Sequence, residues 1–125
     1  MNLLLDTHVL VWWLDDAKAL SAKARKLIAA TNNTVFISAA SIWELRIKEA
    51  LGKVDLPKRF EEVLNSQPFE QLSITASHAH ALRSLPPHHR DPIDRMLIAQ
   101  AQTESLILVT HDEILKDYDV EVVLV

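Results

Sequence analysis

In the segment Asn2-Leu3-Leu4-Leu5-Asp6-Thr7, a short apolar run is followed at once by an acid and a hydroxyl residue. Apolar residues on both faces of a strand are typical of a parallel sheet that is covered on both sides. We therefore predict a buried parallel strand over residues 2–5, with Asp6 at its carboxyl end. Ligands of open parallel sheets bind beyond the carboxyl ends of the strands, so Asp6 lies where a functional site is expected.

Strand and helix patterns alternate along the rest of the chain. Further strands are predicted over residues 35–37, 106–109 and 120–124, and a weaker one over residues 71–74. The helical patterns cover residues 9–14, 21–30, 39–51, a helix opened by Pro57, a helix from Thr75 or Ser77 to about Leu85, residues 91–103, and a short turn at 112–115. Strands separated by helices predict the α/β class, as a three-layer α/β/α sandwich with a parallel sheet of about five strands.

Length and composition indicate the kind of protein. A chain of 125 residues with 49% hydrophobic content fits one domain spanning residues 1–125. The absence of cysteine excludes disulfides and thiolate chemistry, and it fits a reducing cytoplasm. The early apolar run Val9–Leu14 is too short for a membrane span and lacks the flanks of a signal peptide. We therefore expect a soluble, cytoplasmic protein.

Charge argues against a generic nucleic-acid binder, because the formal net charge is −4. Basic residues nevertheless gather near residues 46–59 and 88–95, which leaves a local positive rim possible. Solvated helix faces explain any single one of these residues equally well.

Four acids lie where predicted strands end or the following helices begin. They are Asp6, Glu44, Asp94 and Asp112. Each has a structural explanation by itself, because aspartate caps helices and Glu44 can pair with Lys48. Together they are harder to explain, since two carboxylates ~5 Å apart repel by ~3 kcal/mol at an effective dielectric constant of ~20. A divalent cation or shared protons would relieve this repulsion. Oxygen ligands favour Mg²⁺ or Mn²⁺, which support phosphodiester hydrolysis.

Other common sites are disfavoured. A single glycine argues against a glycine-rich phosphate loop or a dinucleotide fingerprint, and neither Gly-x-Ser-x-Gly nor His-Glu-x-x-His occurs. His88 and His89 with Asp91 could ligate zinc, but a polar loop before a helix is the better interpretation of this stretch.

Four segments carry a resemblance to a known family. They are Leu3-Leu-Leu-Asp-Thr-His-Val-Leu10, Ser38-Ala-Ala-Ser-Ile-Trp-Glu-Leu45, His89-Arg-Asp-Pro-Ile-Asp-Arg-Met-Leu-Ile-Ala-Gln-Ala101 and Leu106-Ile-Leu-Val-Thr-His-Asp112. With these segments in this order over nearly its whole length, the chain resembles the PIN-domain ribonucleases, and most closely the VapC-type toxins of toxin–antitoxin modules. The fold implied by this resemblance, a small α/β/α sandwich, agrees with the element pattern.

The resemblance also implies a site. The acidic residues of the family correspond to Asp6, Glu44, Asp94 and Asp112, and Asp91 is a possible further ligand. We favour Asp94 over Asp91 because Asp91 has the better capping position, directly before Pro92. Thr7 and Thr110 are candidates for hydroxyls that orient the carboxylates. The candidates for RNA contacts are Arg46, Lys48 and Arg95.

The implied activity is that of an endoribonuclease that depends on Mg²⁺ or Mn²⁺, in which activated water attacks phosphorus in line. The implied partners are the RNA substrate, a small cognate antitoxin that occludes the acidic site, and a second copy of the chain in a homodimer.

Two other functions remain open at this point. The first is a non-catalytic interaction domain with Trp12, Trp13 and Trp43 as apolar anchors, although core burial is the expected role of at least two of them. The second is another metal-dependent phosphoryl hydrolase, such as a phosphatase or a receiver-like domain. It is weakened because Asp6-Thr7-His8 lacks a second carboxylate two residues on.

Overall fold

The computed structural model describes residues 1–125, and its elements alternate as expected for an α/β protein. The strands are β1 (Asn2–Leu5), β2 (Thr34–Ser38), β3 (Phe69–Leu72), β4 (Ile107–Thr110) and β5 (Val122–Leu124). The α-helices are α1 (Thr7–Leu14), α2 (Ala22–Ala29), α3 (Ala39–Ala50), α4 (Phe60–Asn65), α5 (Ala76–Ala81) and α6 (Pro92–Glu104), and the 3-10 helices are η1 (Leu82–Ser84) and η2 (Glu113–Asp117).

The strands form one parallel sheet in the order β3-β2-β1-β4-β5. In its register, Leu3 of β1 pairs with Val35 of β2 and with Ile107 of β4. Because β1 is central and every strand runs the same way, the carboxyl ends of β1, β2 and β4 share one edge. The helices α1 and α3 and the 3-10 helix η2 begin at that edge, within three residues of these strand ends.

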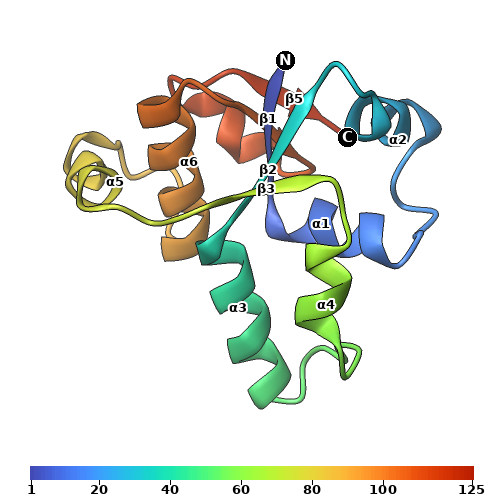
Figure 1. Cartoon of the computed structure of the whole chain (residues 1–125). Coiled ribbons are helices and arrows are strands. Elements are labelled where there is room, and N and C mark those ends of the chain that lie inside the picture. Colours follow the sequence, from blue (N-terminus) through green and yellow to red (C-terminus); the bar gives the residue numbers. More distant parts are fainter.

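The two faces of the sheet are buried under different helices. Leu3 and Leu5 pack with residues of α1, α2 and α4, whereas Leu4 packs with residues of α6 and with Tyr118, and all three leucines are fully buried. Figure 1 shows the same layers, with α5 and α6 on one side of the sheet and α1, α2 and α4 on the other. The alternation along β1 therefore builds two cores, which confirms the predicted three-layer α/β/α arrangement with five parallel strands.

Two predicted boundaries were wrong. The helix expected from Pro57 begins at Phe60, because the Pro57 carbonyl accepts the N–H of Phe60 (3.0 Å) in a turn. The weak strand predicted at residues 71–74 lies two residues earlier, where Phe69 pairs with Val35 and packs against the core. Ile74, which the prediction placed in this strand, is 38% exposed.

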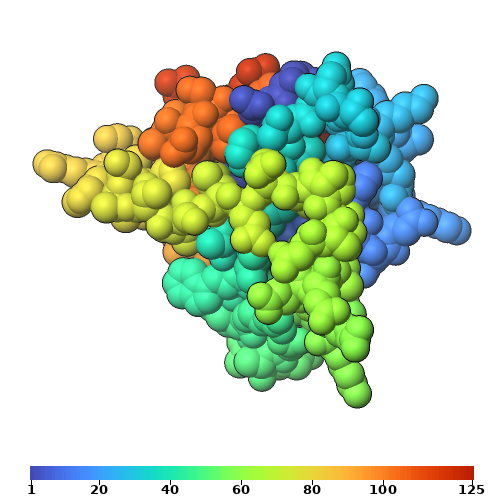
Figure 2. Space-filling view, in the orientation of Figure 1, coloured from blue at the N-terminus to red at the C-terminus, as the bar shows by residue number.

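Two further features describe the molecule as a whole. In the space-filling view, α3 and α4 together form the lower end of the molecule (Figure 2). None of the helices is both long and apolar enough to cross a lipid bilayer.

Candidate metal centre

Asp6 links β1 to the start of α1. Its Oδ1 accepts the N–H of Val9 (2.8 Å), which makes it the N-cap of α1, and its Oδ2 accepts the hydroxyl of Thr110 at the end of β4. The residue is only 4% exposed. Burial raises the pKa of Asp6, although the hydrogen bonds from Thr110 and Val9 oppose this effect. The cap uses Oδ1, so Asp6 can cap α1 and also bind a metal.

Asp91 and Asp94 have different roles at the start of α6. The Oδ1 of Asp91 accepts the N–H groups of Ile93 (2.8 Å) and Asp94 (3.2 Å), so Asp91 is the N-cap, as predicted. Asp94 makes no cap, and its side chain is 24% exposed.

Asp94 lies among other acids. Burial, then the charge of Asp91, and to a smaller extent the charges of Asp6 and Glu44 together raise the pKa of Asp94 to about 7, against an opposing effect of His89. The carboxylates of Asp6 and Glu44 therefore lie near enough to Asp94 for their charges to act on it.

Asp112 reaches the same place from β4. It caps η2 by accepting the N–H of Ile114 (3.0 Å), and its own N–H donates to the Thr110 hydroxyl (3.0 Å). Thr110 therefore contacts the carboxylate of Asp6 and the backbone N–H of Asp112.

Glu44 lies in the second turn of α3. Its side chain is 15% exposed and pairs with the ammonium group of Lys48 (2.8 Å), as the sequence suggested. Lys48 thus balances a candidate ligand rather than standing free for RNA.

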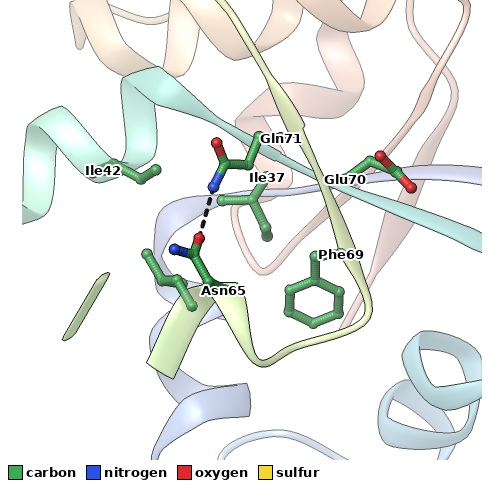
Figure 3. Close-up of a pocket in the computed structure, with 7 residues that line it drawn as sticks. Ile37, Ile42, Asn65, Phe69, Glu70 and Gln71 are labelled. Carbon is green, nitrogen blue, oxygen red and sulfur yellow. Dashed lines mark hydrogen bonds between the residues drawn. The ribbon is translucent and has the colours of Figure 1, made fainter. Parts of the chain in front are cut away.

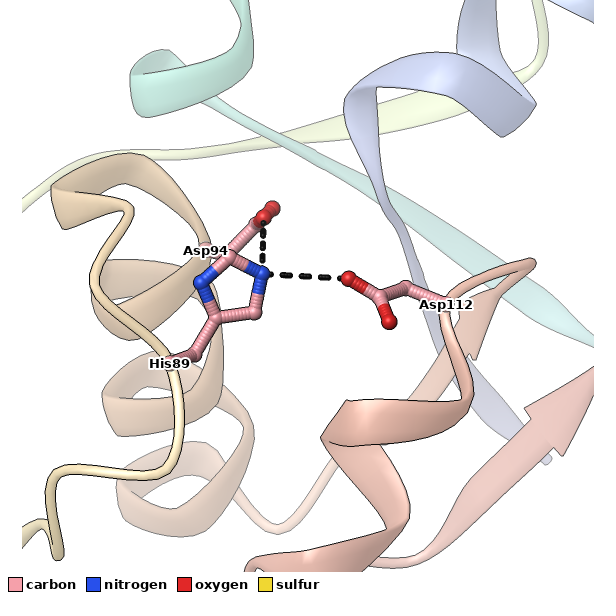
Figure 4. A group of neighbouring side chains, drawn as sticks. All are labelled: His89, Asp94 and Asp112. Carbon is pink, nitrogen blue, oxygen red and sulfur yellow. Dashed lines mark hydrogen bonds and ion pairs between the residues drawn. The ribbon is translucent and has the colours of Figure 1, made fainter.

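His89 was not predicted to belong to this site. Its Nε2 lies 3.1 Å from Asp94 Oδ2 and 3.0 Å from Asp112 Oδ2 (Figure 4). One suitable ligand atom from each of these three residues lies within 4.8 Å of the other two. The prediction treated residues 88–89 as a polar loop. A usable signal was the position of His89 two residues before a helix-capping aspartate, from which its ring can reach back to the cap.

Two predicted contacts differ in the structure. The Thr7 hydroxyl donates to Ser41 Oγ (3.0 Å) instead of to a carboxylate, because α1 packs against α3 at this point. The guanidinium of Arg95 donates to the carbonyls of Pro86 (2.9 Å) and His89 (3.4 Å), so it secures the loop before α6 rather than pointing free for RNA.

Arg46 remains available near the surface. It pairs with Glu49 (2.8 Å), lies over the ring of Phe60, and is 47% exposed.

A pocket between β2, β3, α3 and α4 lies apart from these acids (Figure 3). Gln71 donates to Asn65 Oδ1 across it (3.0 Å), and Glu70 is the only charged residue in its lining. This lining has no group of acids for a cation and no basic residue for a phosphate, so we do not place the site there.

The donor set of the acidic cluster fits a hard divalent cation. Its ligand atoms are carboxylate oxygens with one imidazole beside them, and the neighbouring negative charges that, with burial, raise the pKa of Asp94 to about 7 call for balancing positive charge. A bound Mg²⁺ or Mn²⁺ would supply that charge.

Comparisons with known proteins agree with this fold. The family model described as PIN domain matches residues 3–121. A search of curated proteins finds no match. Among solved structures, VapBC2 of Rickettsia felis bound to a promoter DNA fragment is 18% identical, with a TM-score of 0.76, and the match covers 99% of this chain and 98% of that one.

Two further structures are similar. DNA-bound VapBC of Salmonella typhimurium is 17% identical, with a TM-score of 0.68 and coverage of 98% and 97%. The PIN domain endonuclease Utp24 is 17% identical, with a TM-score of 0.51 and coverage of 92% of this chain and 74% of that chain.

Proposed function

Because this chain belongs to the PIN domain family, we propose that it is a metal-dependent endoribonuclease and the toxin of a toxin–antitoxin module. The observation that carries the proposal is the cluster of Asp94, Asp112 and His89, together with the effect of the charges of Asp6 and Glu44 on Asp94. Similarity to a PIN domain endonuclease and to VapBC complexes supports the activity and the module. A chain without cysteine also suits the cytoplasm, where we place it.

Asp6, Glu44, Asp94 and Asp112 would hold the cation. A bound Mg²⁺ or Mn²⁺ would lower the pKa of water and stabilise the charge that develops on the phosphate oxygens. Thr110 fixes Asp6 and Asp112 relative to each other, and Asp91 keeps α6 in place so that Asp94 faces them. Arg46, whose side chain is 47% exposed, remains a candidate for a phosphate of the RNA, and so do Lys48 and Arg95.

The activity is tested by exchanging Asp6 for Asn. Asn caps helices as well as Asp does, so Asp6→Asn keeps the start of α1 and removes one charge from the site. Purified wild-type protein, freed of any inhibitor, should cleave RNA in Mn²⁺ and stop in a chelator, whereas Asp6→Asn should be inactive. Asp55→Asn makes the same chemical change at an exposed position and should keep full activity.

Three outcomes contradict the proposal in different ways. Cleavage that persists in Asp6→Asn or in the chelator excludes this site. Mn²⁺ binding without RNA cleavage points to another phosphoryl hydrolase. Binding of neither Mn²⁺ nor RNA points to a non-catalytic interaction domain.

A protein partner is supported by α3. Trp43, Ile47 and Leu51 are spaced by one helical turn along α3 and its end, and they are 60%, 43% and 64% exposed. Trp12 and Trp13, in contrast, pack against the core, as expected for two of the three tryptophans. Single exposed apolar residues are ordinary, but an apolar stripe marks an interaction surface.

We propose that the antitoxin binds this stripe, which consists of Trp43, Ile47 and Leu51. Trp43 is adjacent to Glu44, so a partner that covers the stripe lies beside the acidic site and can occlude it. The similarity to VapBC structures supports an antitoxin partner. We also propose a homodimer, which would use a different surface.

A further inference from the structure

The imidazole of His89 bridges two carboxylates that come from different elements. Asp94 belongs to α6, whereas Asp112 lies between β4 and η2, and both have an oxygen within hydrogen-bond distance of the same ring nitrogen, Nε2 (Figure 4). The side chain of His89 is only 16% exposed. Its ring is therefore part of the acidic cluster and not a surface histidine.

The proton of this ring has a defined position. The backbone N–H of Asp91 donates to Nδ1 of His89 (3.0 Å). A nitrogen that accepts a hydrogen bond carries no proton, so the neutral ring has its proton on Nε2, where it faces Asp94 and Asp112. Direct ligation of a metal by Nε2 would require the proton to move to Nδ1, where it would meet the N–H of Asp91.

The loop that carries the ring is itself fixed. The N–H of His89 donates to the hydroxyl of Tyr118 (2.7 Å), and its carbonyl accepts from Arg95. Tyr118 is 4% exposed, so this anchor lies in the core. The orientation of the imidazole is thus set from both sides, by the backbone anchors and by the cap residue Asp91.

We propose that His89 is a positioning residue: its Nε2 is hydrogen-bonded to Asp112 and lies 3.1 Å from Asp94 Oδ2, and so holds the two carboxylates together, ready for the cation. The inference rests on the metal site of the proposed function. Two carboxylates held close together repel each other, and a shared donor offsets part of that repulsion. Each carboxylate has two oxygens and about four lone-pair sites, so it can accept from His89 and ligate a cation at once.

The test measures Mn²⁺ affinity by calorimetry, without any assay of activity. His89→Phe removes the donor and should weaken Mn²⁺ binding by about 10- to 100-fold, the usual effect of losing a group that orients metal ligands. His89→Gln keeps an N–H donor in the side chain and should bind Mn²⁺ much more tightly than His89→Phe does. His88→Phe is the matched control, because His88 contacts Tyr118 and no carboxylate, and it should bind as wild type does.

A measurement on the wild-type protein makes the test independent of how the variants fold. Pulsed electron paramagnetic resonance of bound Mn²⁺ should show no coupling to a directly ligated imidazole nitrogen. Strong nitrogen coupling overturns the proposal, because His89 would then be a ligand. Unchanged affinity in a folded His89→Phe, or His89→Gln as weak as His89→Phe, overturns it too.

The failure of this inference differs from the failure of the proposed function. If wild type binds Mn²⁺, Asp94→Asn abolishes binding and His89→Phe does not weaken it, only the role of His89 is wrong. If wild type binds no Mn²⁺, or Asp94→Asn binds it equally well, the proposed metal site and the proposed role of His89 are both wrong.

Discussion

The carboxyl group of Asp94 destabilises the protein at neutral pH when no cation is bound. Its pKa is about 7 in the folded protein, against 3.8 for the ordinary group. Between these two values the folded protein binds more protons than the unfolded chain does, so the free energy of unfolding decreases as the pH rises through this window. At ~1.4 kcal/mol for each pKa unit, the loss reaches at most about 4 kcal/mol above pH 7.

The substitution Asp94→Asn removes this cost. In a chelator at about pH 8, urea denaturation should give Asp94→Asn a higher free energy of unfolding than wild type, by up to ~4 kcal/mol. The unfolding free energies of the two proteins should converge near pH 4. Mn²⁺ should stabilise wild type and leave Asp94→Asn unchanged. A wild type that is the more stable protein at pH 8 without metal contradicts the account of Asp94. Asp55→Asn, at an exposed position, should keep the pH dependence of wild type.

At the same scale, the sequence indicated the four acids but not the groups around them. Asp6 and Asp112 follow apolar strands, so their edge of the sheet could be predicted from the chain alone. The bridge by His89 and the contacts of Arg95 with Pro86 and His89 depend on how one loop folds back over α6. That path is set by tertiary contacts such as Tyr118 with His89, which lie 29 residues apart in the chain.

At the scale of elements, two aspartates at the start of α6 are expected to have different roles, Asp91 as the helix cap and Asp94 as a metal ligand. Asp91→Ala should lower the free energy of unfolding by about 1 kcal/mol, because two N–H groups at the start of α6 lose their acceptor. Asp91→Asn keeps the cap and should unfold as wild type does, with Mn²⁺ affinity close to that of wild type. The matched substitution Asp94→Asn should abolish Mn²⁺ binding. Equal loss of Mn²⁺ binding in Asp91→Asn would make Asp91 a ligand.

The elements predicted best from sequence are those with two independent signals. The start of α6 combines a capping aspartate with proline at the first helical position, and β1 and β4 each contain three consecutive apolar residues. The prediction was poorer at Pro57, where proline also suits a turn, and at β3, an edge strand whose burial does not alternate. Strand pairing, rather than local pattern, fixes the position of β3.

At the scale of the whole molecule, the α3 stripe should bind the antitoxin without contributing to the fold. The double variant Trp43→Ala with Leu51→Ala should keep its unfolding free energy and its RNA cleavage, but should bind the antitoxin encoded beside it more weakly by ~2 kcal/mol or more, about 30-fold. Ile74→Ala changes an exposed apolar residue elsewhere and should bind normally.

Light scattering separates the two partners that we propose. If the double variant loses its homodimer and still binds the antitoxin, the stripe is the dimer interface and the assignment to the antitoxin is wrong. If it loses neither partner, the stripe has no role in assembly.

The most direct test of the central claim is to map the ends of RNA cut in cells after induction of wild type and of Asp94→Asn. Because water rather than the ribose hydroxyl is the proposed nucleophile, wild type should generate new RNA ends that carry no 2′,3′-cyclic phosphate, and Asp94→Asn should generate none. New ends with a cyclic phosphate, or the same cleavage sites with Asp94→Asn, would contradict a metal-dependent endoribonuclease built on these acids.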